Sequence, residues 1–355
     1  DAPVYNSSHL FGFFSVFNPD AVKDVKLFKG GIPSMYGGRS SSILDVKMKE
    51  GNAKKLEVNG GVGVIFSRLS IEAPIVKDKA SFIVAARRSY IDILAKPFLT
   101  GNNANAAFNF YDLTAKVNYT INSKNTVFMS GYFGRDVFGT GFGFDWGNST
   151  LTTRWNHVFS NKLFLNATAF YSNYDYMLDS DIENKRPNDA FKWTSNIENL
   201  SIKPDFTYYV RPDNTISFGG QLLSYDFTPG KANATSNGEK REFGQANKQG
   251  VEASAYVGHD WKINSRLTVQ YGVRYSHYDY KSLNGEYYDR IPIAVSTENP
   301  SGYILKINQT NPSAVVASYG NWEPRFAMNV TTNESTSLKV SYNRLAQYIH
   351  LMSNT

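Results

Sequence analysis

Most of the chain alternates apolar and polar residues, one by one, over segments of about ten residues or more. In residues 267–276 the odd positions read Leu, Val, Tyr, Val and Tyr, and the even positions read Thr, Gln, Gly, Arg and Ser. The same alternation recurs in residues 115–121, 251–261 and 338–344. A period of two residues predicts β-strands that have one apolar face and one polar face.

The connections between these segments are of two kinds. Short polar turns are predicted at 76–79, 122–125, 160–162, 211–214, 263–266 and 331–335. Longer connections are predicted at 91–108, 137–148, 179–191, 228–247 and 281–317. Short and long connections alternate, which is typical of up-and-down strands that have tight turns on the periplasmic side of a membrane and long loops outside.

Counting the alternating segments predicts about thirteen strands. Their expected starts are 57, 67, 80, 110, 125, 149, 163, 192, 215, 249, 266, 319 and 335. Many segments run for about 10 to 16 residues, which is enough to cross a bilayer at a tilt. Soluble strands usually have about five or six residues. Aromatic residues such as Tyr171, Tyr275 and Trp261 gather near segment ends, where amphipathic rings favour the lipid headgroups. We therefore expect an all-β fold, a large antiparallel transmembrane β-barrel.

The stretch from Asn18 to Val46 has a different pattern. Asn18-Pro19-Asp20 has the features of a helix start. Residues 23–28 and 42–48 alternate like strands, and glycine pairs at 30–31 and 37–38 permit turns between them. A unit this small buries little core, so we expect it to lie inside a larger object formed by the residues after Gly51.

Composition narrows the function classes. The 355 residues have 23 Tyr, 24 Phe and 27 Gly but no cysteine, and the net charge is +6. Aromatic and glycine richness suits a membrane barrel. The absence of cysteine excludes disulfide scaffolds, thiolate metal sites and cysteine nucleophiles. Lys54-Lys55 and Arg87-Arg88 are the nearest basic clusters, and both are too short for a nucleic-acid surface.

Other candidate chemistry is weak. Residues 139–143 are glycine-rich but lack the following helix of a phosphate loop, so we expect a flexible outer loop. Asp179, Asp181 and Glu183 have a spacing that suits calcium, although a solvated acidic loop is the favoured interpretation. The five histidines lack zinc-site spacing. We expect no enzyme activity, no metal site and no cofactor.

The ends of the chain suggest a fragment. Residues 1–5 (DAPVY) read like the interior of a folded segment, and the last residues follow directly on a strand-like segment. An odd number of strands also differs from the even number with which bacterial barrels close. We therefore expect an incomplete barrel.

The segment 18–48 resembles the end of the plug domain of TonB-dependent outer-membrane receptors. The positions that carry the resemblance are Asn18-Pro19, Val25 to Gly30, Met35-Tyr36-Gly37 and Ile43 to Val46. Residues 56–65 and 80–90 look like the first barrel strands of the subgroup whose full-length members have a carboxypeptidase-regulatory-like domain at the amino terminus. The resemblance implies that residues 1–52 are the C-terminal part of a plug and that residues 53–355 are N-terminal barrel strands.

The resemblance also implies a function and a site. Receptors of this family import a substrate across the outer membrane, and the plug apex binds that substrate. Carried over, the apex residues are Asn6, Ser8, His9, Phe11, Phe13, Tyr36 and Arg39. For Arg39 we favour a structural role, pairing with a barrel-wall carboxylate, because a charge inside a barrel needs a partner. Glu72, Glu252 and Asp260 have positions or parity compatible with the inner wall, and Arg87-Arg88 are likewise expected to line it.

For the aromatic cluster Phe11, Phe13, Phe14 and Phe17, packing as the core of the small unit is the favoured alternative to ligand contact. The expected partners are outer-membrane lipid, the TonB complex through a region outside this chain, and a substrate-binding lipoprotein or other envelope protein. No nucleic acid is expected. Two alternatives stay open, namely a passive or accessory barrel within an envelope transport or secretion assembly, and a soluble β-sandwich or propeller with lectin-like binding.

Overall fold

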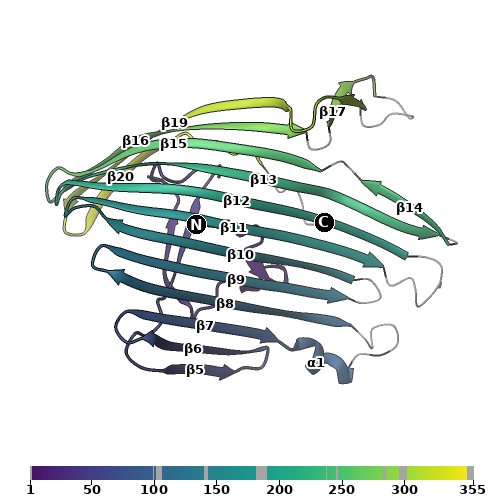
Figure 1. The fold of residues 1–355 in the computed structure, drawn as a ribbon, viewed down its shortest axis with the longest axis horizontal. Coiled ribbons are helices and arrows are strands. Elements are labelled where there is room, and N and C mark those ends of the chain that lie inside the picture. The colour runs from purple at the N-terminus through teal and green to yellow at the C-terminus, as the bar shows by residue number, and fades with distance from the viewer. Residues whose placement is uncertain are drawn as a thin grey trace.

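The computed structural model describes residues 2–98, 100, 106–139, 143–180, 190–236, 238–244, 247–282, 285–295 and 302–349. Most of these residues belong to one antiparallel sheet of 14 strands (Figure 1). Its strands pair in chain order from β5 to β20, except that the path passes from β13 to β15 and from β16 to β19, and that β14 pairs with β13 off the path. We call this sheet the wall.

The strands of the wall are long, as the alternation predicted. They are β5 (Glu57–Val62), β6 (Phe66–Val76), β7 (Ala80–Ser89), β8 (Ala107–Asn122), β9 (Asn125–Gly139), β10 (Gly143–Val158), β11 (Leu163–Ser180), β12 (Ala190–Arg211), β13 (Asn214–Ser236), β14 (Glu239–Gly244), β15 (Lys248–Lys262), β16 (Leu267–Ser282), β19 (Val315–Asn333) and β20 (Thr336–Asn343). Leaving out β14, which pairs only with β13, the thirteen starts lie within six residues of the predicted positions.

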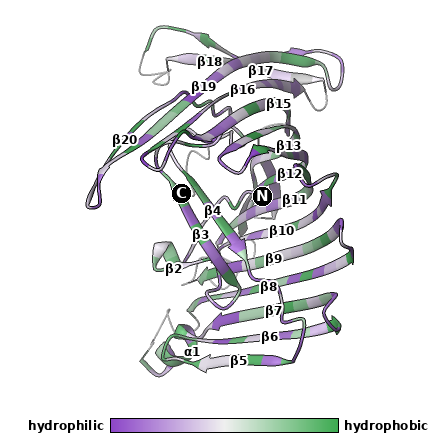
Figure 2. Ribbon diagram, turned by 90° about the vertical axis from the view of Figure 1, so that its left-hand side faces the viewer, coloured by the Kyte–Doolittle hydropathy of each residue, from purple (hydrophilic) through white to green (hydrophobic). Residues whose placement is uncertain are grey.

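The wall curves around a hollow (Figure 2). Its two faces follow the predicted parity, because Glu252 and Tyr256 are buried on the concave face while Val257 is 46% exposed on the other. Likewise Arg274 is buried and Tyr271 is exposed. The convex face therefore carries exposed apolar and aromatic side chains, and the concave face carries polar ones. This is the arrangement of a strand wall between lipid and a lumen.

All six short turns occur where they were predicted, at one end of the wall. The long connections at the other end contain structure of their own. The β7–β8 connection has α1 (Ile91–Ala95) and η2 (Lys96–Phe98), the β13–β15 connection has β14, and the β16–β19 connection has the hairpin of β17 (Glu286–Pro292) and β18 (Tyr303–Gln309). No helix in the described part of the chain is long and apolar enough to cross a membrane.

The prediction of a long connection at 137–148 was wrong. Strand β9 continues to Gly139 and β10 begins at Gly143, and the two strands pair up to these residues. The two strands extend beyond the predicted ends because each added residue gains ladder hydrogen bonds with both neighbouring strands. The wall is therefore taller here than the sequence predicted. Residues 140–142 of the glycine-rich loop, and Asp181 and Glu183 of the calcium hypothesis, lie outside the described residues.

Residues 2–52, which we call the inner segment, lie on the concave side of the wall (Figure 2). They form two small hairpins. One pairs β1 (Ser8–His9) with β2 (Phe14–Ser15) around η1 (Leu10–Gly12), and the other pairs β3 (Val22–Phe28) with β4 (Ile43–Met48). The strands predicted at 23–28 and 42–48 are confirmed.

The helix predicted after Asn18 is wrong. The Asn18 side chain does cap the following backbone, accepting a hydrogen bond from Asp20 N at 3.0 Å. However, the backbone bonds Ala21 N to Asn18 O and Val22 N to Pro19 O close only one turn before β3 begins at Val22. The strand pairing with β4 takes over before a second helical turn can form, and nucleating a helix of one turn is unfavourable.

Candidate functional site

The tip of the first hairpin has a strained backbone. Leu10 and Phe11 have φ angles of 49° and 59°, and Gly12 follows with 105°. Residues other than glycine are uncommon at positive φ, and Asn and Asp are enriched among those found there. A bulky side chain in this region costs about 1–2 kcal/mol per residue. Strain of this kind persists where the surroundings hold the backbone, and it is typical of functional sites.

This tip, which we call the apex, presents two aromatic rings. Phe11 and Phe13 are 61% and 81% exposed, so the prediction that they form the core of a small unit is wrong. Phe14 does pack, but against the wall, with its ring centroid 5.5 Å from Phe66 and 5.7 Å from Phe110. The apex therefore uses one aromatic side chain for attachment and leaves two at its surface.

Phe11 borders a group of rings on the concave face, at the wall end that carries the long connections. Its centroid lies 5.2 Å from Trp146 and 5.8 Å from Phe138. Further rings extend the group along neighbouring strands, where Phe144 lies 4.7 Å from Trp146 and 5.4 Å from Tyr176. These are ordinary aromatic contact distances. The apex and the wall thus form a joint aromatic surface.

The predicted apex residues that precede the tip make hydrogen bonds and packing contacts inside the protein. The Asn6 side chain accepts a hydrogen bond from Ser8 N at 3.2 Å, and its carbonyl accepts one from Asn148 Nδ2 at 3.1 Å. Asn6 is only half-buried, whereas His9 is buried, with 1% of its surface exposed. Of the predicted apex residues Asn6, Ser8, His9, Phe11 and Phe13, only Phe11 and Phe13 are therefore exposed.

His9 joins the apex to the wall. Its Nδ1 lies 2.7 Å from Asp136 Oδ2 on β9, and its Nε2 lies 3.5 Å from Asp112 Oδ2 on β8. Asp136 Oδ1 also accepts a hydrogen bond of 2.8 Å from Leu10 N, in the strained turn. One wall carboxylate thus holds both the imidazole and the apex backbone.

Arg87 on β7 completes this cluster. Its Nε donates to Asp112 Oδ2 at 2.8 Å, and its Nη2 donates to the carbonyls of Ser15 and Val16 at 2.9 and 3.1 Å. The imidazole of His9 also stacks on Phe110 with a centroid distance of 4.4 Å. We call His9, Arg87, Asp112 and Asp136 the first anchor.

The surroundings of His9 change its proton affinity. Burial lowers the pKa of the imidazole, but the hydrogen bonds and charges of Asp112 and Asp136 raise it by more, so the pKa lies above the ordinary 6.5. Opposite charges within a few ångströms favour the charged form in this way. His9 therefore remains an imidazolium at a pH at which a solvent-exposed histidine has lost its proton.

The second predicted apex, around residues 36–39, is also partly buried. Tyr36 donates a hydrogen bond to Asp45 Oδ2 at 3.1 Å, and Lys203 of β12 lies 5.7 Å from its ring centre. Burial and then the charge of Asp45 raise the pKa of Tyr36, so it stays a neutral donor. Arg39 donates to its neighbour's carbonyl, Gly38 O, at 2.8 Å and lies 6.0 Å from the ring centre of Tyr5.

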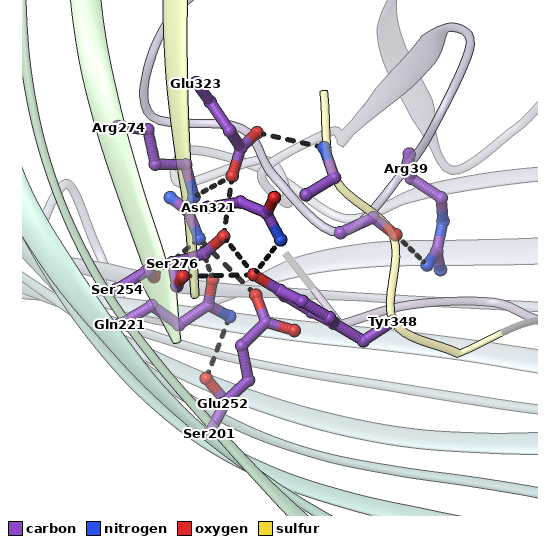
Figure 3. A network of polar contacts seen from close by, with 12 residues as sticks. Arg39, Ser201, Gln221, Glu252, Ser254, Arg274, Ser276, Asn321, Glu323 and Tyr348 are labelled. Carbon is purple, nitrogen blue, oxygen red and sulfur yellow. Dashed lines mark hydrogen bonds and ion pairs between the residues drawn. The ribbon is translucent and has the colours of Figure 1, made fainter. Parts of the chain in front are cut away.

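The wall supplies two buried arginines of its own, Arg274 and Arg325, and Figure 3 shows Arg274 and its contacts. Arg274 on β16 has no exposed surface. It donates to Ser254 Oγ at 2.6 Å and lies 3.9 Å from a carboxylate oxygen of both Glu252 and Glu323. Arg325 on β19 donates to Glu323 Oε2 at 2.9 Å. We call Arg274, Arg325, Glu252 and Glu323 the second anchor.

The second anchor contacts the inner segment through backbone carbonyls. Arg274 Nη1 donates to Met35 O at 3.4 Å, and Arg325 Nη1 donates to Pro33 O. Gly37 lies directly against the guanidinium of Arg274, and a Cβ at this position would overlap with it. Glycine is therefore required here for close approach.

Tyr348, beyond β20, closes the network of the second anchor. Its hydroxyl lies 2.8 Å from Ser276 Oγ, and Ser276 Oγ in turn donates to Glu323 Oε1 at 2.8 Å. Its ring stacks on Tyr278 with a centroid distance of 5.2 Å. Residues far apart in sequence thus share one hydrogen-bonded system between wall and inner segment.

A cavity lies beside the second anchor, where Arg325 is one of its lining residues. Its volume is about 140 Å³, and it separates Ile32, Ser34 and Met35 from Tyr256 and Asp260 of the wall. The inner segment is attached by the polar clusters together with buried apolar side chains such as Val16, Ala21 and Ile32.

Sequence reasoning found part of this arrangement. Glu72, Glu252 and Arg87 are buried on the concave face as expected, but the expectation that Arg88 also lines the wall is wrong, because successive strand residues face opposite sides and Arg88 is exposed on the other face. It missed the anchor residues Asp112, Asp136, Arg274 and Glu323. The available signal was a charged residue at an inward position of a strand whose outward neighbours are apolar. Among the described residues, no group of three or more His, Asp or Glu is arranged to hold a metal ion.

The fold and the two-faced wall define the class of the protein, an outer-membrane β-barrel. Residues 208–352 match the family described as "Outer membrane beta barrel domain". No curated protein sequence matches the chain. The family match and the two-faced wall both point to the bacterial outer membrane.

Solved structures add the plugged architecture. The copper transporter OprC is similar with a TM-score of 0.65 and 12% identity over 94% of this chain and 51% of that one. The ferric-catecholate import receptor Fiu from E. coli K12 has a TM-score of 0.63, with 12% identity over 92% and 60%. The iron transporter FrpB from Neisseria meningitidis has 0.64, with 13% identity over 96% and 55%.

The chain has the fold of about half of each of these structures, an antiparallel barrel wall with a small segment on its inner side. At this level of identity the likeness concerns the fold alone. The chain spans about half the length of these structures.

Proposed function

We propose that this chain is part of a TonB-dependent transporter that imports a substrate across the outer membrane. In this proposal residues 1–52 are the C-terminal part of the plug domain, and residues 53–355 are the N-terminal strands of the barrel. The TonB complex supplies the energy through a region outside this chain. The protein acts as a transporter and catalyses no covalent reaction.

One observation carries the proposal. The inner segment lies on the concave face of the wall and is attached there by polar clusters, while its strained apex leaves Phe11 and Phe13 exposed at the end with the long connections. A segment held by buried charges and hydrogen bonds can be released by breaking a few of them. A continuous apolar interface would resist such a movement, because its energy is spread over a large area.

The apex is the proposed substrate contact. Phe11 and Phe13, together with the neighbouring rings of the wall, would bind a ligand through an apolar or planar surface. The second loop would contribute Tyr36 and Arg39, and the residues behind the apex would support it, namely Asn6, Ser8 and His9. The structural neighbours named above are, by their titles, a copper transporter, a ferric-catecholate import receptor and an iron transporter.

The test uses the full-length protein, purified gently from its own outer membrane. Mass spectrometry of bound small molecules and of co-purifying chains identifies the ligand and any partner lipoprotein. Uptake of that ligand by cells is then measured with and without a protonophore. We expect uptake to stop when the inner membrane is de-energised. Uptake that continues unchanged would instead support a passive or accessory barrel of an envelope assembly.

Variants locate the site. We expect Phe11→Ala and Phe13→Ala together to lower ligand affinity at least tenfold, since each exposed ring contributes on the order of 1 kcal/mol or more to stacking contacts. Phe133→Ala is the matched control, because this ring is 42% exposed on the convex face. Equal affinity of the apex variant and the control would place the substrate elsewhere.

A further inference from the structure

We propose that His9, Asp112 and Asp136 act as positioning residues, which hold the apex against the wall in a proton-dependent way. This inference deepens the proposed function and rests on it for its meaning in substrate binding. Its structural content, a change in apex mobility with pH, can be measured without any ligand or transport.

The first step of the argument is the geometry of Asp136. Its two oxygens bind two successive residues of the inner segment, Oδ2 with the His9 imidazole and Oδ1 with Leu10 N. Leu10 is also the first residue of the strained turn. A turn that costs energy in its central residues needs external contacts to hold it, and Asp136 supplies a hydrogen bond to its backbone. Releasing Asp136 therefore leaves the apex held mainly by the ring contacts of Phe11.

The second step is the charge balance. The groups that face the imidazole are Asp112 on β8, Asp136 and Tyr132 on β9, and Arg87 through Asp112 from β7. With His9 protonated, two cations balance two carboxylates. With His9 neutral, the cluster keeps one cation for two buried carboxylates, and the imidazole can donate to only one of them. A buried excess charge is costly, so deprotonation weakens the cluster.

The third step is the burial of the cluster. His9, Asp112 and Asp136 are 1%, 3% and 3% exposed, so water does not screen the imbalance. Because the pKa of His9 is raised in the folded protein, the direction of the pH dependence follows. The stabilisation is fully present below the unfolded pKa of about 6.5 and is lost as the pH rises through the higher folded value. The apex is thus held firmly in acid and loosely in alkali.

The experiment places a nitroxide on the apex. The chain contains no cysteine, so Phe13→Cys provides one attachment site within it. Any cysteine elsewhere in the full-length protein is replaced by serine. The label is attached once, and the mobile fraction of its spectrum is then recorded from about pH 5.5 to about pH 9 in detergent, a range that brackets the ordinary histidine pKa. We expect an immobile label at low pH and a one-proton rise of the mobile fraction with a midpoint above 6.5.

Variants assign the transition. His9→Gln should abolish the pH dependence, because glutamine does not titrate. Asp136→Asn should lower the midpoint by about one unit or more, because it removes one of the charges that favour the imidazolium. His277→Gln is the matched control, since this histidine pairs with Asp279 at 3.0 Å and is 41% exposed on the convex face. It should leave the curve unchanged.

The outcomes separate the two proposals. The proposed positioning role of His9, Asp112 and Asp136 is overturned if the label mobility is independent of pH in the parent protein, or if the transition survives in His9→Gln. If His9→Gln does not assemble, the midpoint in Asp136→Asn decides the question, and an unshifted midpoint overturns the positioning role. Failure of energised uptake alone overturns the proposed function and leaves the positioning role unaffected.

Discussion

The two anchors attach the same inner segment to the same wall by different means. In the first anchor the inner segment contributes a titratable side chain, His9, and the wall contributes Asp112, Asp136 and Arg87. In the second anchor the wall contributes all four charged groups, and the inner segment contributes the backbone carbonyls of Pro33 and Met35. One attachment therefore depends on a proton, and the other depends on backbone shape.

This difference separates an attachment that pH can regulate from one that is independent of protonation. The second anchor balances Arg274 and Arg325 against Glu252 and Glu323, and all of these charge pairs join residues of the wall. Its hold on the inner segment requires glycine at position 37 rather than a particular protonation state. The first anchor is balanced only when His9 joins it. We therefore expect the second to be permanent and the first to be adjustable.

The largest expected effect comes from Arg274→Met. This substitution leaves Glu252 and Glu323 with less compensation in a buried site, which costs about 3–5 kcal/mol. The measurement is a urea titration in which a nitroxide attached at Ser41→Cys reports the release of the inner segment from the wall. Arg88→Met on the exposed face is the control and should change the midpoint little. Equal midpoints for the two variants would contradict the role of Arg274.

The next effect concerns the first anchor. His9→Phe keeps a ring on Phe110 but removes the hydrogen bond to Asp136, which costs about 1.5–3 kcal/mol while the imidazole is charged. Because the His9 pKa is raised, the loss should be full in acid, below about 6.5, and shrink towards alkaline pH. The same urea titration, repeated across pH, measures it. A loss that is constant or grows with pH would show that His9 acts through packing alone.

Backbone shape is tested by Gly37→Ala. The new methyl group overlaps with the guanidinium of Arg274 and should cost about 1–3 kcal/mol. Gly38→Ala separates this overlap from strain, because Gly38 has a φ of 70° but no atom lies within 4 Å of the place its Cβ would take. We expect the overlap to displace Arg274 and thus to couple with Arg274→Met in a double-mutant cycle. Additive effects would mean that Gly37 acts independently of this arginine.

The smallest effect is expected for Tyr348→Phe. It keeps the stack on Tyr278 and removes the hydroxyl that bonds Ser276 and Asn321, which costs about 1 kcal/mol. The loss should not vary with pH across the histidine range, in contrast with His9→Phe. A pH-dependent loss at Tyr348 would remove the distinction between the anchors.

Much of the wall was predictable from the sequence because alternation is a local signal. In residues 267–276 the alternation of apolar and polar residues predicts which side chains face lipid and which face inward. The short turns mark where one strand ends and the next begins. The strand ends were less predictable where pairing decided them. Strands β9 and β10 extend to Gly139 and Gly143, since each has a partner on both sides. The helix expected at Asn18 gave way to strand pairing for a similar reason.

The sequence by itself determined the two-faced barrel wall, the small glycine-rich unit inside it and the resemblance to a receptor plug. Only the tertiary structure decided which charges meet. His9 and Asp136 are 127 residues apart, and Arg274 and Met35 are 239 residues apart. Parity says that such side chains point into the lumen, but the stagger and curvature of the strands set their height and neighbours. For that reason His9, expected to touch a ligand, lies instead where the inner segment meets its wall.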